Sequence, residues 1–210
     1  VLADSLRGSG LQVSLLEAGG LSLEPRSQDL YAAEIIGQPY SGTTDGRFRV
    51  LGGSSTRWGG QILPFANQDF CQRNHVPESG WPIAPKDLEP FYAQVEKILG
   101  VNHLPFSSDL LTYLPQPLPE NLQSGLQVRF SKWAPFSRRN LARTLGRRLQ
   151  GDPKIKIYYH ANVTLIQLHP QGHRVDWVEA KTYEGKNVSF SASQYSNTPS
   201  DSGCLCHGLY

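Results

Sequence analysis

The segment QVSLLEAGG, residues 12–20, decides the fold class of this 210-residue chain. Val13 to Leu16 form an apolar run with the composition of a buried strand, and the run ends on an acid, Glu17. The turn that follows consists of Ala18, Gly19 and Gly20. Residues 1–10 precede the strand with apolar side chains at helical spacing and two glycines that can stop a helix. A helix followed at once by a buried strand predicts an α/β fold.

The acid at the end of the strand points to a dinucleotide. In the second half of a βαβ dinucleotide-binding unit, a carboxylate at this position accepts hydrogen bonds from ribose hydroxyls. The unit also needs a glycine-rich phosphate loop about twenty residues before the acid, which here falls upstream of residue 1. Because the chain also contains no methionine, we expect it to be a fragment. The alternative is a strand that ends on a solvated glutamate before a Gly-Gly turn.

A second glycine-rich segment, RVLGGSSTRWGG, occupies residues 49–60. Glycines let backbone amides approach a flat or anionic ligand without an intervening Cβ. Ser54, Ser55 and Thr56 add hydroxyl groups, and Trp58 adds one large planar surface. The segment suits a cofactor with a diphosphate and a broad aromatic ring, although a Gly-Ser-rich run by itself is more often a plain loop.

These two segments and GWPIAPKDLEPFYAQVEKILGV, residues 80–101, occur in an order that resembles the flavin-binding half of the glucose-methanol-choline oxidoreductase family. The resemblance covers residues 1 to about 190 and is closest to the bacterial sugar and alcohol dehydrogenase and pyranose oxidase branch. It implies an α/β fold with an incomplete FAD/NAD(P)-binding Rossmann-like domain, a β-meander and an inserted substrate-domain segment. It also implies FAD, an alcohol, sugar or polyol substrate oxidised by hydride transfer to flavin N5, and an electron acceptor.

The same resemblance implies a set of FAD contacts. Glu17 would hold the adenosine ribose above the turn, the second segment would line the diphosphate and flavin, and Val163 would contact the adenine mainly through its backbone. The full set is Glu17, Ala18, Gly19, Gly20, Gly52, Gly53, Ser54, Ser55, Trp58, Gly59, Gly60 and Val163. Arg57 stands where pyranose oxidases carry a flavin-linked histidine, so the FAD is expected to be non-covalent; a surface or salt-bridged arginine fits the same expectation.

No catalytic residue is assigned, because the catalytic histidine and its partner belong to the C-terminal part of this family. We therefore expect the 210-residue chain to have little or no activity by itself. His160 is interpreted as a hydrogen-bonded structural residue at a strand edge. The remaining histidines considered lie in loops or turns without an evident partner: His75, His103, His169 and His173.

The predicted domain organisation places a partial FAD-binding domain at 1–60 and 150–193, an insertion at 61–149, and an aberrant or disordered tail at 194–210. Helices are predicted over 85–99, ending at Gly100, and over the stripe of Leu141, Leu145 and Leu149. Strands follow, joined by a turn at Glu184 and Gly185, as a β-meander. Core packing is favoured over a substrate-cavity role for Trp133 and Phe136.

Composition limits the remaining choices. The composition, with 39% hydrophobic residues and a net charge of +2, predicts a globular domain. Because there is no long apolar run, no transmembrane segment is expected. Three cysteines indicate a reducing compartment, so the cytoplasm is the default, and the cluster Cys204, Cys206 and His207 is too weak a signal for a metal site. A nucleic-acid role for the arginines of 138–148 is disfavoured, because a solvated helix face accounts for them.

A non-enzymatic carbohydrate- or protein-binding module remains as an alternative. Its surface platforms would be Trp58, Trp81, Trp133 and Trp177.

Overall fold

The computed structural model describes residues 1–114, 128–197 and 203–208. It divides the chain into two compact units: residues 1–57 with 140–210 form the first unit, and residues 58–139 form the second unit. Helices and strands are mixed in the described parts, which agrees with the expected α/β class. No helix in these parts has both the length and the apolar character needed to cross a membrane.

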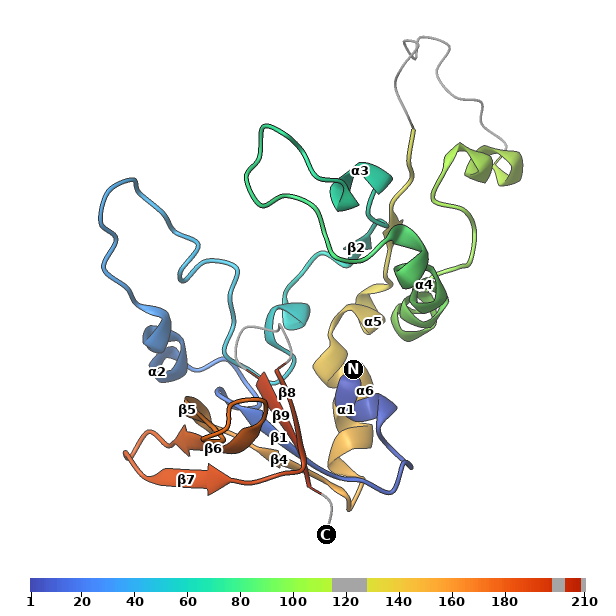
Figure 1. Ribbon diagram of the computed structural model, residues 1–210. Coiled ribbons are helices and arrows are strands. Elements are labelled where there is room, and N and C mark those ends of the chain that lie inside the picture. The colour runs from blue at the N-terminus through green and yellow to red at the C-terminus, as the bar shows by residue number, and fades with distance from the viewer. Residues whose placement is uncertain (115–127, 198–202, 209–210) are drawn as a thin grey trace. The chain divides into compact units, whose positions relative to one another are not determined.

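The first unit is built from a four-stranded sheet, a three-stranded meander and a few helices (Figure 1). Its helices and strands are α1 (Leu2–Ser5), β1 (Gln12–Glu17), α2 (Pro25–Gln28), α6 (Leu141–Gln150), β4 (Ile155–Tyr158), β5 (Asn162–Leu168), β6 (Val175–Lys181), β7 (Asn187–Phe190), β8 (Gln194–Asn197) and β9 (Gly203–Gly208). The larger sheet has the order β4-β1-β9-β8, and β1 is parallel to β4. The antiparallel order β5-β6-β7 is the predicted meander.

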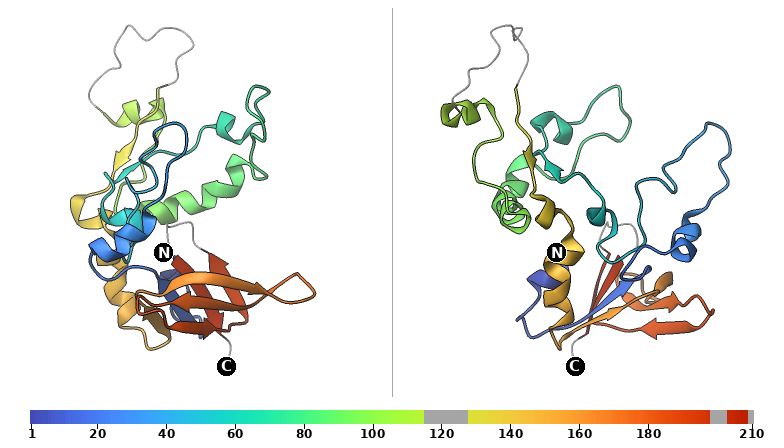
Figure 2. Two further views of the ribbon diagram at one scale, coloured as in Figure 1. Left: turned by 90° about the vertical axis from the view of Figure 1, so that its left-hand side faces the viewer. Right: turned by 180° about the vertical axis from the view of Figure 1, so that it is seen from behind.

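The first unit has three layers because β1 is apolar on both of its faces. Val13 packs with Leu149 of α6 and Ala3 of α1, so the helices cover one face of the sheet. Leu16 is fully buried against Val178 of the meander, which covers the other face. Figure 2 shows the helices and the meander on opposite sides of the sheet. Alternation of side chains along one strand therefore fixes both contacts.

The end of the first unit differs from the prediction, which had no strand after residue 193. Strand β9 pairs antiparallel with the whole of β1, from Gln12 to Glu17, and β8 pairs with β9. Since β4 occupies only one edge of β1, the backbone N–H and C=O groups of its other edge need partners. Strand pairing uses backbone groups and needs no particular side-chain pattern, so the sequence of residues 194–208 does not predict strands β8 and β9.

The second unit contains one long helix and several short elements. Its helices and strands are β2 (Gln61–Ile62), α3 (Asn67–Phe70), α4 (Pro85–Leu99), β3 (Lys132–Trp133) and α5 (Phe136–Arg139). The bounds of α4 confirm the predicted helix. Asp87 accepts a hydrogen bond from the backbone N–H of Ala84 at 2.8 Å, and Gly100 ends the helix with a left-handed φ of +68°.

The prediction of core packing for Trp133 and Phe136 is wrong. The two side chains are 57% and 82% exposed. Trp133 lies on the two-residue strand β3, which pairs with β2 as a two-stranded sheet in the described part of the chain. The guanidinium carbon of Arg139 lies 6.0 Å from the Trp133 ring centroid and 5.7 Å from that of Phe136.

Candidate functional site

The carboxyl ends of β1 and β4 lie side by side in the first unit. The strands are parallel, with Leu16 opposite Tyr158. Beyond them, the backbone N–H of His160 donates to the carbonyl of Gly19 at 3.0 Å, and that of Ala161 donates to the carbonyl of Glu17 at 2.9 Å. Ligands of open α/β sheets bind outside the carboxyl ends of parallel strands. This edge of the sheet is therefore the candidate site.

Glu17 is the charged residue at this edge that the sequence singled out. Its side chain is only 6% exposed, and Oε1 accepts a hydrogen bond from the backbone N–H of Gly19 at 2.8 Å. The tight turn of Ala18, Gly19 and Gly20 thus holds an acceptor group in one orientation at the end of the buried strand.

The fold itself requires Gly19 of this turn, whereas Gly20 lies against the ends of side chains. A Cβ on Gly19 would overlap the carbonyl of Arg49 and lie 2.6 Å from the backbone nitrogen of Val50, closer than real Cβ atoms come. A Cβ on Gly20 would overlap the carboxylate of Glu24 and lie 3.0 Å from Nε2 of His160. Residues 49–50 run directly against the turn, and the N–H of Leu51 donates to the carbonyl of Gly20 at 2.9 Å.

The second glycine segment forms a 3₁₀ turn over Gly53–Thr56. Gly52 has a left-handed φ of +92°, and a Cβ there would lie 2.9 Å from the Cβ of Ala142. The hydroxyls hold the turn: Thr56 Oγ1 donates to the Gly53 carbonyl at 2.8 Å, and Ser54 Oγ donates to the Gly46 carbonyl at 2.9 Å. Ser55 Oγ donates to the Gly52 carbonyl.

Trp58, Gly59 and Gly60 belong to the second unit. The indole N–H of Trp58 donates to the carbonyl of Arg139 at 2.7 Å. Gly60 has a φ of +82°, and its bare face is filled by the Arg139 side chain, with Cγ 2.7 Å from the position of a Cβ. A Cβ on Gly59 would make ordinary contact with the Trp133 ring at 3.4 Å.

Val163 lies on β5, opposite Ala180 of β6. Its half-buried side chain packs against the core cluster that contains Leu16 and Val178. The structure thus brings the meander and the end of β1 together through apolar contacts.

His160 is hydrogen-bonded, as the sequence predicted. Its Nε2 lies 2.8 Å from Oε2 of Glu24, and its ring lies 5.0 Å from that of Tyr183. The residue has a φ of +53°, a conformation that L-residues rarely adopt. The contact with Glu24 ties the end of β4 to the segment that follows the Gly19–Gly20 turn.

In the second unit, the structure reveals a polar cluster that the sequence did not. His103 Nδ1 lies 2.6 Å from Oε2 of Glu96, and Lys132 Nζ donates to Oε1 of the same carboxylate. Burial raises the pKa of Glu96, which is 7% exposed, but the hydrogen bonds and charges of Lys132 and His103 outweigh it and hold the pKa below its ordinary value. His103, for which no partner was evident in the sequence, is therefore partnered by Glu96. The contact joins Glu96 of α4 to His103, which follows the end of the helix at Gly100. The apolar spacing of the helix does not predict such a polar contact.

The described residues contain no group of three or more His, Cys, Asp and Glu side chains that could hold a metal ion. The side chains of Cys204, Cys206 and His207 lie outside the described part of the structure.

Comparison with known proteins does not add a relative. No family model matches the chain, and no curated protein and no solved structure matches it.

Proposed function

We propose that the first unit is a Rossmann-like domain that binds the adenosine ribose of FAD. The chain would be part of an FAD-dependent oxidoreductase acting on the CH–OH group of an alcohol, sugar or polyol, as the resemblance to the glucose-methanol-choline family implies. The observation that supports this proposal most is the position of Glu17. Its buried carboxylate stands at the carboxyl end of β1, beside the parallel strand β4.

The chemistry of Glu17 fits a ribose. A carboxylate can accept hydrogen bonds from two hydroxyls, and the bond from Gly19 N–H fixes its orientation before a ligand arrives. The helix α6 leads into β4 and covers the sheet on the side opposite the meander, which is the layering that an α/β nucleotide domain needs.

The glycines of the two segments support FAD binding less strongly than Glu17 does. At Gly19, Gly20, Gly52 and Gly60 the missing side chain makes room for other parts of the chain. These four positions therefore need no ligand to explain them, and the proposal does not rest on them. In the proposed arrangement Glu17 holds the ribose, and the backbone of Val163 is a candidate adenine contact.

Bound FAD would supply the redox chemistry by accepting a hydride at N5. Arg57 is exposed, and its guanidinium carbon lies 5.5 Å from the Phe48 ring centroid. A guanidinium group is protonated at neutral pH and has no nucleophilic atom that could form a covalent link to flavin. We therefore propose a non-covalent cofactor. No described residue is assigned as the catalytic base.

A titration of FAD tests the proposal. FAD fluorescence anisotropy is measured against the chain, against Glu17→Gln and against Glu34→Gln, an exposed glutamate in the same unit. In Glu17→Gln the amide oxygen still accepts from Gly19 N–H, but the NH₂ group replaces one acceptor, so affinity is expected to fall about tenfold or more. Glu34→Gln should bind as the unmodified chain does. Absence of saturable FAD binding, or equal affinity of all three proteins, would contradict the proposal.

The exposed aromatic residues of the second unit favour one alternative, a carbohydrate-binding surface. Trp133 and Phe136 are both mostly exposed. Trp81 is 47% exposed and contacts Phe65 and Phe70 at centroid distances of 5.0 and 5.5 Å. Sugars bind aromatic faces through such exposed rings. Saturable quenching of tryptophan fluorescence by a mono- or oligosaccharide without FAD, lost in Trp133→Ala, would favour this alternative.

A further inference from the structure

A cavity of about 690 Å³ lies within the first unit. Its walls are residues 21–23, residues 50, 51, 56 and 57 beside the 3₁₀ turn, and one face of α6 with the preceding Asn140. None of the described residues that line this cavity belongs to the set of proposed FAD contacts. Its volume lies within the range of about 300–1,000 Å³ that is usual for small-molecule sites.

The wall of this cavity is positively charged. Arg57 extends from the turn, and Arg143 and Arg147 extend from adjacent turns of α6. The described lining residues include no aspartate or glutamate. Asn140 and Gln150 add polar side chains at the two ends of the helical wall. Three guanidinium groups without a carboxylate among them produce a concentrated positive potential in a concave surface.

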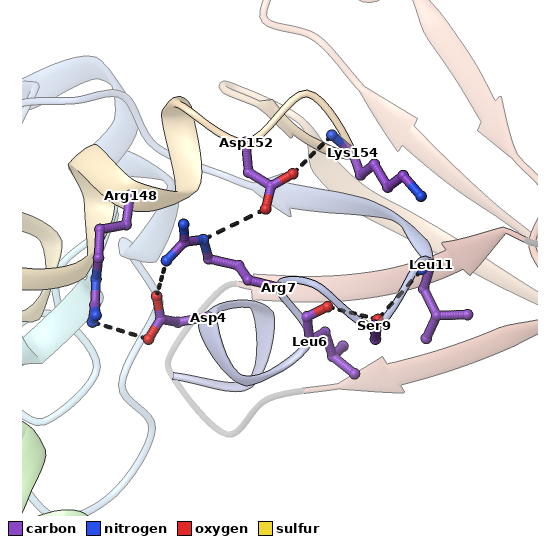
Figure 3. A network of polar contacts seen from close by, with 8 residues as sticks. All are labelled: Asp4, Leu6, Arg7, Ser9, Leu11, Arg148, Asp152 and Lys154. Atoms are coloured by element: carbon purple, nitrogen blue, oxygen red, sulfur yellow. Dashed lines mark hydrogen bonds and ion pairs between the residues drawn. The ribbon is translucent and has the colours of Figure 1, made fainter.

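Arginines elsewhere around α6 have acidic partners (Figure 3). Arg148 is ion-paired with Asp4 at 3.0 Å, and Arg7 lies 3.5 Å from Asp152. Arg148 follows Arg147 directly in the sequence but is absent from the cavity lining. On α6, Arg148 therefore binds a carboxylate of the chain itself, whereas Arg143 and Arg147 border the cavity.

The floor of the cavity includes a glycine that packing does not require. Gly146 lies in the interior of α6, where glycine costs roughly 1 kcal/mol relative to alanine. A Cβ at this position would meet only Leu51, at an ordinary distance of 3.8 Å. Unlike Gly19 and Gly52, it makes no room for another part of the chain. Its bare surface enlarges the cavity between the arginines.

We infer that this cavity is a binding site for a small phosphorylated molecule. Guanidinium groups bind phosphate oxygens through paired, charge-assisted hydrogen bonds, and the arrangement of three of them suits a ligand with two or more negative charges. The size of the cavity favours a compact metabolite over the extended backbone of a nucleic acid. This inference does not rest on the proposed function, because the charge and the volume of the cavity do not depend on bound FAD.

Inorganic pyrophosphate is the probe for the test. Isothermal titration at constant ionic strength compares the chain with Arg143→Gln, Arg147→Gln and Arg174→Gln. Arg174 is an exposed arginine of the same unit, next to Asp176, and its substitution changes the net charge equally. We expect saturable binding with one site per chain, about tenfold weaker in each of the two cavity variants and unchanged in Arg174→Gln. Equal losses in all three variants, or no saturation, would overturn the inference.

A second variant removes space instead of charge. Gly146→Leu keeps all three arginines and should abolish pyrophosphate binding, while circular dichroism verifies that the protein remains folded. Unchanged binding by the folded variant would overturn the inference. So would displacement of pyrophosphate by FAD, or a short DNA duplex that binds with the same sensitivity to Arg143 and Arg147. Failure of FAD to bind would leave the pyrophosphate result unaffected, so the two proposals fail separately.

Discussion

The substitution Gly19→Ala tests whether the glycines of the Glu17 turn serve the fold or a ligand. The added methyl group would overlap the carbonyl of Arg49 and lie 2.6 Å from the nitrogen of Val50. Both neighbours are backbone atoms, which cannot move aside by changing a rotamer. The two chain segments would have to separate by roughly 1.5 Å before the contact became ordinary.

The expected loss of stability follows from this displacement. Overpacking of a tight interior contact costs about 1–3 kcal/mol. The hydrogen bond from Leu51 N–H to the carbonyl of Gly20 would also weaken, which adds about 0.5–1.5 kcal/mol. We therefore expect Gly19→Ala to lower the free energy of unfolding by about 2–4 kcal/mol, which moves the urea midpoint down by about 1–2 M.

The assay is urea unfolding followed by far-UV circular dichroism, with amide hydrogen exchange of β1 reporting on the first unit. Gly146→Ala is the matched control, because it makes the same chemical change in the same unit with its nearest atom at 3.8 Å. It should leave stability unchanged or raise it by up to about 1 kcal/mol. If Gly19→Ala proved as stable as the unmodified chain, the packing explanation of this glycine would be refuted.

Two further predictions concern the buried Glu96. Lys132→Met leaves the carboxylate without its buried cation and should destabilise the second unit by about 3 kcal/mol or more. His103→Ala removes a side chain that is 68% exposed and should cost less than about 1 kcal/mol. Chemical unfolding of both variants measures the difference, and equal losses of stability would contradict the prediction. Because the pKa of Glu96 is lowered in the folded state from its ordinary value of 4.5, this group stabilises the fold above that pH and the contribution disappears as the pH falls through the folded pKa. Stability measured between pH 6 and about pH 3 should therefore decline less steeply in Glu96→Gln, and parallel curves would argue against a lowered pKa.

Several local features could be predicted from the sequence because they depend on neighbours along the chain. The helix over 85–99 follows from its apolar spacing, from Asp87 in its first turn and from Gly100 at its end. The stripe of Leu145 and Leu149 on α6 follows in the same way, as do the meander strands and the acid at the end of β1. The roles of the proposed FAD contacts remain predictions.

Other features depend on segments that are distant in sequence, and only the tertiary structure decided them. The pairing of β9 with β1 satisfies backbone groups that have no residue-specific signature. A Cβ on Gly19 would meet the carbonyl of Arg49, which is distant in the sequence, so the residue pattern around Gly19 does not predict this tight contact. The partner of His103 and the three-arginine cavity likewise arise where separate segments meet. A sequence thus determines which residues are apolar, charged or without a side chain, while packing determines what fills the space beside them.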